Sequence, residues 1–290
     1  MVTETFRRVD GVDLMADVFR PADVSDVPAL LWLHGGALIG GRRRDLVSAQ
    51  RDRYLDAGWA VVAVDYRLAP ESPIGAILDD IDAAWAWMLE VAPRHRLDIS
   101  RLAVVGHSAG GYLTLARGPR LRPQPRALVS FYGYGDIAGP WYTEPSERYL
   151  LESPVARADA LEAIARTSPW ADGDLSERML FYLHCRQQGS WPSEVIGDVA
   201  GADGTGLERY CPERHVTADH PPTLLIHGSE DDDVPVERSA EMAAALTAAG
   251  VPHELVIVPG LGHGFDGSMA DDVVSASFEQ VLRFLASHLR

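Results

Sequence analysis

The 290-residue sequence contains no lysine and no asparagine, and it has only two cysteines. Because lysine is missing, the chain cannot form a Schiff base or a Walker-type phosphate loop, and it cannot be a hydrolase of the Ser-x-x-Lys class. The missing asparagine leaves no N-glycosylation sequon. Cys185 and Cys211 lie 26 positions apart, without CxxC spacing. We therefore expect two free thiols and no metal site.

Charge and hydrophobic patterning exclude further classes. The formal net charge is -16, from 42 acidic and 26 basic residues, which argues against binding nucleic acid through its phosphates. No apolar stretch reaches the roughly 18 residues of a membrane span. Residues 1–10 are polar and charged, unlike a signal peptide. We expect a soluble cytoplasmic protein with neither a nucleic-acid nor a membrane partner.

The most informative motif is Gly-His-Ser-Ala-Gly at residues 106–110. It follows the apolar run 102–105 and precedes a helix-compatible stretch, 111–117. A serine hydroxyl becomes an accessible nucleophile at a sharp strand-to-helix turn, and the flanking glycines leave room for the bend. Ser108 is therefore a candidate nucleophile. The bare pattern also fits an ordinary turn rich in glycine and serine, so other parts of the site must decide.

An upstream segment could supply an oxyanion hole. The apolar run 29–33 leads directly into His34-Gly35-Gly36-Ala37. Backbone N–H groups stabilise the negative charge of a tetrahedral intermediate, and glycines allow the chain to approach closely. Gly35, Gly36 and Ala109, the residue after the candidate nucleophile, could donate these N–H groups. A plain Gly-Gly turn is the alternative.

A candidate acid and a candidate base follow in the chain. The buried-strand run 223–226 is followed by three adjacent aspartates, Asp231, Asp232 and Asp233. Spacing alone does not choose among them, and at least two are expected to be solvated because like charges repel. His263 lies in the glycine-rich segment 259–265, which follows another apolar run. The order serine, aspartate, histidine is that of the α/β-hydrolase arrangement.

These motifs together resemble the α/β-hydrolase superfamily, in particular the esterase/lipase branch of hormone-sensitive-lipase-like and acetyl-esterase-like enzymes. The matching segments are 34–36, 65–71, 106–111, 227–235 and 262–265. The resemblance implies Asp231 as the acid and Gly35, Gly36 and Ala109 as the oxyanion donors. It also implies that Asp65, Arg67 and Glu71 form a support network behind the oxyanion loop.

One position departs from the pattern of that branch. Its members usually have a third glycine after His-Gly-Gly, where this chain has Ala37. A positive φ is penalised for a residue with a Cβ, so we expect the loop to be set differently here.

The alternation of strands and helices predicts an α/β-hydrolase fold, with a mostly parallel central sheet, helices on both faces and an inserted lid. The first strands are expected to form an antiparallel pair that turns at Asp10-Gly11. Residues 1–136 and 220–290 are assigned to the core, because the alternation stops after Asp136 and resumes at Thr223. Residues 137–219 are assigned to the lid.

The insertion is rich in aromatic residues that could line a substrate pocket. Trp141 and Tyr142 are the strongest candidates because they closely follow a strand end, and Arg186 could contact a substrate carboxylate or simply end a helix. The other aromatic candidates, each of which could instead form the insertion's own core, are Tyr149, Trp170, Tyr182 and Trp191.

The sequence as a whole predicts a carboxylesterase that cleaves short-chain acyl esters with Ser108, His263 and Asp231, through an acyl-enzyme. Alternatives are a feruloyl or carbohydrate esterase, an aminopeptidase, a tailoring hydrolase or acyltransferase of secondary metabolism, and a non-catalytic ligand-binding protein. We expect no cofactor and no metal. The expected partner is a small ester substrate, and a homodimer stays open.

Overall fold

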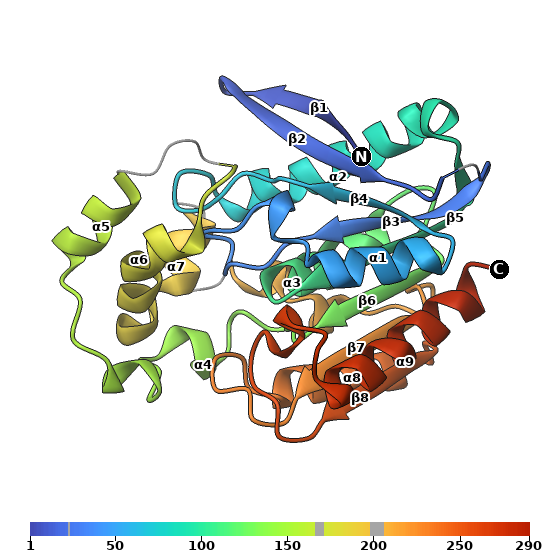
Figure 1. The fold of residues 1–290 in the computed structure, drawn as a ribbon. Helices are drawn as coiled ribbons and strands as arrows, with labels where there is room; N and C mark the ends of the chain where they lie inside the picture. The colour runs from blue at the N-terminus through green and yellow to red at the C-terminus, as the bar shows by residue number, and fades with distance from the viewer. Residues whose placement is uncertain (23, 166–170, 198–205) are drawn as a thin grey trace.

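The computed structural model describes residues 1–22, 24–165, 171–197 and 206–290. Its centre is an eight-stranded sheet in the order β1-β2-β4-β3-β5-β6-β7-β8. The strands are β1 (Val2–Val9), β2 (Val12–Phe19), β3 (Val27–Leu33), β4 (Ala60–Val64), β5 (Leu97–His107), β6 (Ala127–Phe131), β7 (Thr223–Gly228) and β8 (His253–Val258). The predicted antiparallel pair is confirmed in β1 and β2, and β2 is also antiparallel to β4. From β4 to β8 all neighbours are parallel (Figure 1).

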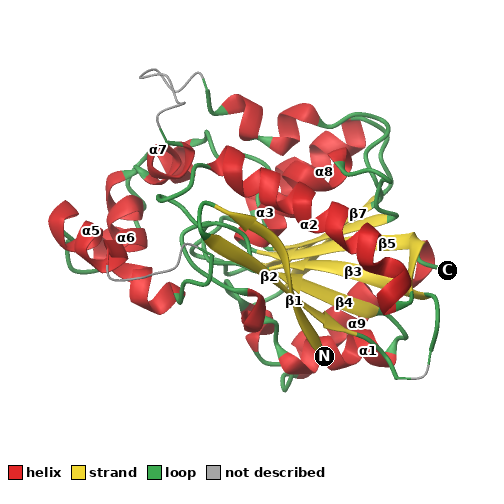
Figure 2. Ribbon diagram, turned by 90° about the horizontal axis from the view of Figure 1, so that it is seen from above, coloured by secondary structure: helices red, strands yellow, loops and turns green. Residues whose placement is uncertain are grey.

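Helices cover both faces of the sheet, as predicted (Figure 2). One face carries α1 (Ser48–Asp56) and α9 (Asp272–His288), and the other carries α2 (Ile74–His95), α3 (Ala109–Arg117) and α8 (Glu237–Ala248). Strand β3 shows why both faces need cover. Its side chains at Leu31 and Leu33 join one core cluster, whereas Leu30 and Trp32 join the other. A strand buried on both faces reads as a continuous apolar run, which is how the sequence displays it.

The segment 137–219, predicted to be an insertion and called so below, lies between β6 and β7 and adds helices to one end of the core (Figure 1). Its regular elements in the described residues are helical: α4 (Pro140–Thr143), α5 (Arg157–Ala165), α6 (Leu175–Gln188), α7 (Trp191–Ile196) and the short 3-10 helices η3 (Tyr149–Leu151), η4 (Glu208–Tyr210) and η5 (Pro212–His215). Buried side chains such as Phe181 and Trp191 join the same cluster as the core residues Leu38 and Tyr134. The described part of the insertion therefore shares a hydrophobic core with the sheet.

The parallel register brings the predicted motifs to one edge of the sheet. Leu33 pairs with Gly106, and His107 pairs with Phe131. The segments that follow β3, β5, β7 and β8 therefore emerge side by side, because the carboxyl ends of parallel strands meet at the same edge. The two cysteines are buried and free, as expected. No helix in the described ranges is long and apolar enough to cross a bilayer.

Close packing of α3 against the sheet forces a sharp turn at Ser108. This residue has φ 53° and ψ -117°, an unfavourable backbone conformation for a side chain with a Cβ. A Cβ on Gly106 would overlap the carbonyl oxygen of Gly110, and a Cβ on Gly110 would overlap that of Leu33. The two glycines of the motif thus let the helix start directly against β3 and β5.

We expect Gly106→Ala to lower the free energy of unfolding by at least about 1–3 kcal/mol, because the new methyl group has to displace backbone. Gly75→Ala is the matched control, since a Cβ there meets only the Tyr210 hydroxyl, at an ordinary 3.7 Å. Thermal unfolding monitored by circular dichroism measures both. A wild-type melting temperature for Gly106→Ala would contradict this account of the turn.

Candidate active site

Three predicted residues from distant parts of the chain form one hydrogen-bonded series. Ser108 Oγ lies 2.9 Å from His263 Nε2, and His263 Nδ1 lies 2.7 Å from Asp231 Oδ2. Because the carboxylate can only accept, Nδ1 carries the proton, and Nε2 is free to accept from the serine hydroxyl. Ser108 follows β5, Asp231 follows β7 and His263 follows β8. The arrangement has the geometry of a Ser-His-Asp triad.

Asp231 is strongly held in its ionised form. Burial alone would raise the pKa of this carboxyl, but hydrogen bonds from His227 and His263 outweigh that effect and lower the pKa well below its ordinary value. The backbone N–H groups of Asp233 and Val234 also donate to its Oδ1, at 3.0 and 2.8 Å. A permanently charged acid suits the task of stabilising an imidazolium.

The same charges act on His263. Burial disfavours its protonated form, yet the hydrogen bond to Asp231 and the charges of Asp233, Asp231 and Asp266 raise its pKa above the ordinary value of 6.5. The histidine is therefore a stronger base than a free imidazole. A base of this kind can take the proton of an attacking hydroxyl.

The three adjacent aspartates have three different environments. Asp231 has a fully buried side chain. Asp232 is exposed and pairs with Arg148 at 2.8 Å, as expected for a solvated acid. Asp233 departs from the expectation, because it lines the cavity beside Ser108 instead of facing solvent. The turn after β7 points its first acid inward and its third toward the cavity.

The predicted oxyanion segment lies against Ser108. A Cβ on Gly35 would be 3.3 Å from the Cβ of Ser108, and both Gly35 and Gly36 line the cavity. Ala109 is fully buried at the first position of α3. His34 is buried and stacks on Tyr66 with ring centroids 3.9 Å apart. Burial lowers the pKa of His34 to about 4, so this histidine is neutral near pH 7.

Ala37 does not avoid the positive φ that its Cβ penalises. Ala37 and Leu38 both adopt positive φ, at 56° and 60°. The loop therefore accepts the strained conformation, and several hydrogen bonds hold it there. The N–H groups of Ile39 and Gly40 donate to the carbonyl of Gly36 at 2.9 and 2.8 Å.

The insertion contributes two further hydrogen bonds to this loop. Trp191 Nε1 donates to the carbonyl of Ala37 at 2.9 Å. Gly41 N donates to the carbonyl of Gly173 at 2.6 Å. Residues from the insertion thus brace the loop that carries Gly35 and Gly36.

The segment 65–71 supports the oxyanion loop, but not through the ion pairs that the sequence suggested. The Tyr66 hydroxyl donates to the carbonyl of His34 at 2.7 Å, and Ala69 N donates to the carbonyl of Leu38 at 2.8 Å. The expected network within the segment is wrong, because each charged residue pairs elsewhere. Asp65 pairs with Arg43, Arg67 with Asp80 and Asp10, and Glu71 with Arg178.

A cavity of about 310 Å³ opens beside Ser108 and His263. Of the aromatic residues proposed from the insertion, Tyr182 lines it; Trp170 lies outside the described residues. Further lining residues come from the core, among them Trp32, His107 and Tyr132. Trp141 and Tyr142, the strongest candidates from the sequence, do not line this cavity. Their rings stack on each other at 3.7 Å, and Tyr142 also stacks on Trp191 at 4.0 Å.

Arg186 is likewise absent from the cavity lining. It is buried, and its guanidinium lies over the rings of Trp141, Tyr142 and Tyr149. It donates to the carbonyls of Trp141 and Asp233 at 3.1 and 3.0 Å. Arg186 therefore cross-links the insertion to the turn after β7, and it is not placed to contact a substrate carboxylate.

A buried acid next to the triad gave no signal in the sequence. Asp266 is 2% exposed and lines the cavity. Its carboxylate accepts hydrogen bonds from the Tyr132 hydroxyl and from Gln50, the latter at 2.8 Å, and it lies 3.0 Å from His107 Nε2. Asp266 lies three positions after His263, but this spacing does not reveal that the acid faces the cavity unless the conformation of the loop is known. These contacts connect four residues of the cavity lining to one another.

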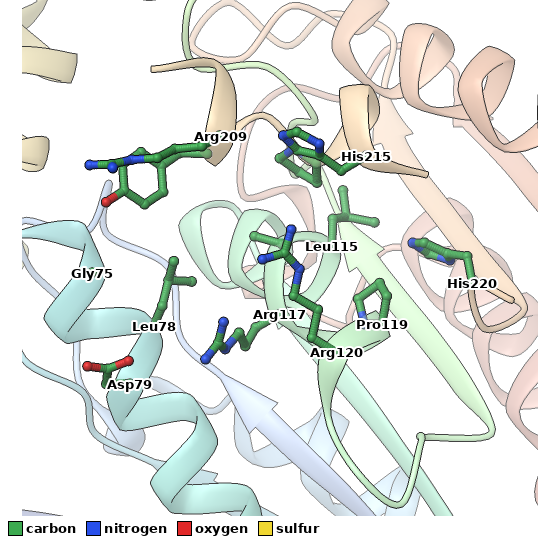
Figure 3. A pocket seen from close by; sticks show the side chains of 13 residues that line it. Gly75, Leu78, Asp79, Leu115, Arg117, Pro119, Arg120, Arg209, His215 and His220 are labelled. Atoms are coloured by element: carbon green, nitrogen blue, oxygen red, sulfur yellow. The ribbon is translucent and has the colours of Figure 1, made fainter. Parts of the chain in front are cut away.

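A second cavity, of about 270 Å³, lies between α2, α3 and the short helices η4 and η5 (Figure 3). It shares no lining residue with the cavity at Ser108. Its lining includes the cationic or titratable side chains Arg117, Arg120, Arg209, His215 and His220. Arg117 is held by Asp82. None of the predicted site residues lies there.

Solved structures share this fold at low sequence identity. An alpha/beta hydrolase superfamily protein from Enterococcus faecalis is 24% identical, with a TM-score of 0.78, covering 99% of this chain and 98% of that one. A bacterial heroin esterase is 23% identical, with a TM-score of 0.72, covering 100% and 84%. A propionate-bound esterase from Thermogutta terrifontis is 21% identical, with a TM-score of 0.68, covering 99% and 93%.

Among curated proteins, the chain is similar to a non-reducing polyketide synthase from Aspergillus calidoustus, at 30% identity over 96% of this chain. A second synthase, from Penicillium brasilianum, is 30% identical over 99% of this chain. The chain spans only 14% of the length of each. A family model described as alpha/beta hydrolase fold matches residues 30–267. With its sheet, its strand order and this match over most of its length, the chain belongs to the α/β-hydrolase family.

Proposed function

We propose that this protein is a serine ester hydrolase that cleaves short-chain acyl esters. The observation that carries the proposal is the continuous series from Asp231 through His263 to Ser108, with separations of 2.7 and 2.9 Å. It ends in a cavity whose lining includes the glycines of the oxyanion segment. The esterases among the similar folds support this reaction class. The site itself supports it more strongly, because one fold can host many functions.

The reaction proceeds through an acyl-enzyme. Ser108 Oγ attacks the ester carbonyl while His263 Nε2 takes its proton, and Asp231 stabilises the resulting imidazolium. Backbone N–H groups of Gly35, Gly36 and Ala109 donate to the oxyanion. His263 then passes the proton to the leaving alkoxide, and the alcohol departs. A water molecule, deprotonated by the same histidine, attacks the acyl-enzyme and releases the acid.

Substitution of the nucleophile and the acid tests this proposal. Ser108→Ala should lower kcat for p-nitrophenyl acetate by at least about a thousandfold, because triad members act as a unit. Asp231→Asn should lower it by at least about a hundredfold, because the amide no longer enforces the required imidazole tautomer.

Asp232→Asn provides the matched control, because Asp232 is exposed and forms an ion pair with Arg148. We expect its kcat to stay within about twofold of wild type. Circular dichroism checks that each variant is folded. Substantial turnover by folded Ser108→Ala, or a larger loss in Asp232→Asn than in Asp231→Asn, would refute the assignment.

The pH dependence of kcat/KM should report on His263. The reaction requires its neutral form, and its neighbours raise its pKa above 6.5. We therefore expect kcat/KM to fall as the pH drops through a midpoint above 6.5. A series of initial rates between about pH 5 and 10 measures it. A midpoint below 6.5 would show that burial, and not the surrounding carboxylates, dominates this histidine.

The size of the cavity predicts a preference for short acyl chains. Its volume of about 310 Å³ is at the low end of the roughly 300–1,000 Å³ of ligand pockets. Each methylene that fits gains about 0.8 kcal/mol of burial, whereas one that does not fit must displace packed side chains. Acetyl to hexanoyl p-nitrophenyl esters should therefore show higher kcat/KM than dodecanoyl esters. An optimum at long chains, or a jump in rate above the micelle concentration, would indicate a true lipase.

A second candidate is an acyl hydrolase or acyltransferase of secondary metabolism. The observation that favours it is the similarity of nearly the whole chain to part of two polyketide synthases. The same triad could act on an acyl thioester, because the chemistry of acyl transfer is shared. Values of kcat/KM for an ester and a thioester with the same acyl group distinguish the two candidates.

A further inference from the structure

The cavity beside Ser108 is strongly acidic. Its described lining includes the carboxylates Asp45, Asp233 and Asp266, and it includes no arginine. Two of these acids have close cationic or hydrogen-bonding partners. Asp45 lies 3.1 Å from Arg42, and Asp266 accepts from Gln50 and lies 3.0 Å from His107. The third acid, Asp233, comes within 3.9 Å of His263 Nε2.

The carboxylate of Asp233 accepts hydrogen bonds from two tyrosine hydroxyls, those of Tyr182 and Tyr149. Its Oδ1 accepts a hydrogen bond from the Tyr182 hydroxyl at 2.6 Å. The guanidinium of Arg186 lies 3.9 Å from the same oxygen and donates instead to the backbone carbonyl of Asp233 at 3.0 Å. The side chain of Asp233 retains 18% of its exposure, and the residue lines the cavity. An accessible anion is therefore available to a bound molecule.

The position of this anion relative to the triad shows which part of a substrate would meet it. Asp233 Oδ2 lies 3.9 Å from His263 Nε2, the same nitrogen that contacts Ser108 Oγ. In the proposed reaction this nitrogen delivers a proton to the departing alkoxide. The oxygen of the leaving alcohol must therefore come close to Nε2, and an alcohol bound there lies within a few bond lengths of Asp233 Oδ2.

We propose that Asp233 makes the site selective for esters whose alcohol part carries a positively charged ammonium group within a few bonds of the ester oxygen. An ammonium group there gains attraction to a partly desolvated carboxylate, whereas a carboxylate in the same place is repelled. This inference rests on the proposed ester hydrolysis. Asp233 would determine which esters bind well, and the triad residues would carry out bond cleavage.

Three acetate esters of similar size test the proposal. They are acetylcholine, its neutral isostere 3,3-dimethylbutyl acetate, and the anionic 3-acetoxypropanoate. The quaternary ammonium keeps its charge at every pH. We expect wild-type kcat/KM to be about fivefold higher for acetylcholine than for the neutral isostere, and lowest for the anionic ester. In Asp233→Asn the ratio between the cationic and neutral esters should fall to about one, with the neutral ester still hydrolysed.

Asp232→Asn is the matched control for the general field of this acidic protein. It removes one negative charge at the adjacent position, where the side chain is exposed and paired with Arg148. Its cationic-to-neutral ratio should equal that of wild type. Equal kcat/KM for the cationic and neutral esters in wild type, a ratio retained in Asp233→Asn, or an equal loss in Asp232→Asn would each overturn the proposal.

An inhibition measurement makes the test independent of any variant. Choline should inhibit wild-type hydrolysis of p-nitrophenyl acetate at a lower concentration than 3,3-dimethylbutan-1-ol does. Equal inhibition constants would overturn the proposed selectivity. If the proposed function is wrong, ester turnover will be absent or will survive Ser108→Ala. If only the proposed selectivity is wrong, hydrolysis of neutral esters will still be present and will still depend on Ser108.

Discussion

The unfavourable backbone conformation of Ser108 is the constraint on which the site depends. It persists because α3 starts directly against β5, where only glycine fits at residues 106 and 110. Ser108 N donates to the carbonyl of Phe131 at 2.8 Å, which ties the turn to β6 as well. The hydroxyl is therefore presented at the sheet edge by packing between three strands and a helix. His263 and Asp231 need only follow neighbouring strands to reach it.

Much of this arrangement could be predicted from the sequence, because buried parallel strands appear as short apolar runs. The residues after those runs include Ser108, Asp231 and His263, and the order of the runs indicated the fold. Strand β5 shows that an apolar run does not always mark where a strand begins. It starts at Leu97, before residues 98–101, of which three are polar, although only the apolar run from Leu102 was visible as a strand.

The substrate pocket was less predictable, for physical reasons. Trp141 and Tyr142 are aromatic and close to a strand end, but their rings are buried against each other and against Trp191. A sequence does not show whether an aromatic side chain faces a cavity or another ring. The position of Asp233 in the cavity lining was not predicted, because a run of adjacent acids normally faces solvent. Its direction is set by the turn after β7, which the sequence does not show.

The two hydrogen bonds from the insertion to the oxyanion loop bear on how a substrate can enter. Trp191 holds the carbonyl of Ala37, and Gly173 accepts from Gly41 on the far side of the same loop. A hinge motion that lifted these residues away would also release the strained peptides at Ala37 and Leu38. Opening of this part of the insertion and rearrangement of the loop that carries Gly35 and Gly36 would then be one event. Movement of the insertion that leaves the loop unchanged would have to keep Trp191 and Gly173 in place, so the positions of the loop and of this part of the insertion are coupled.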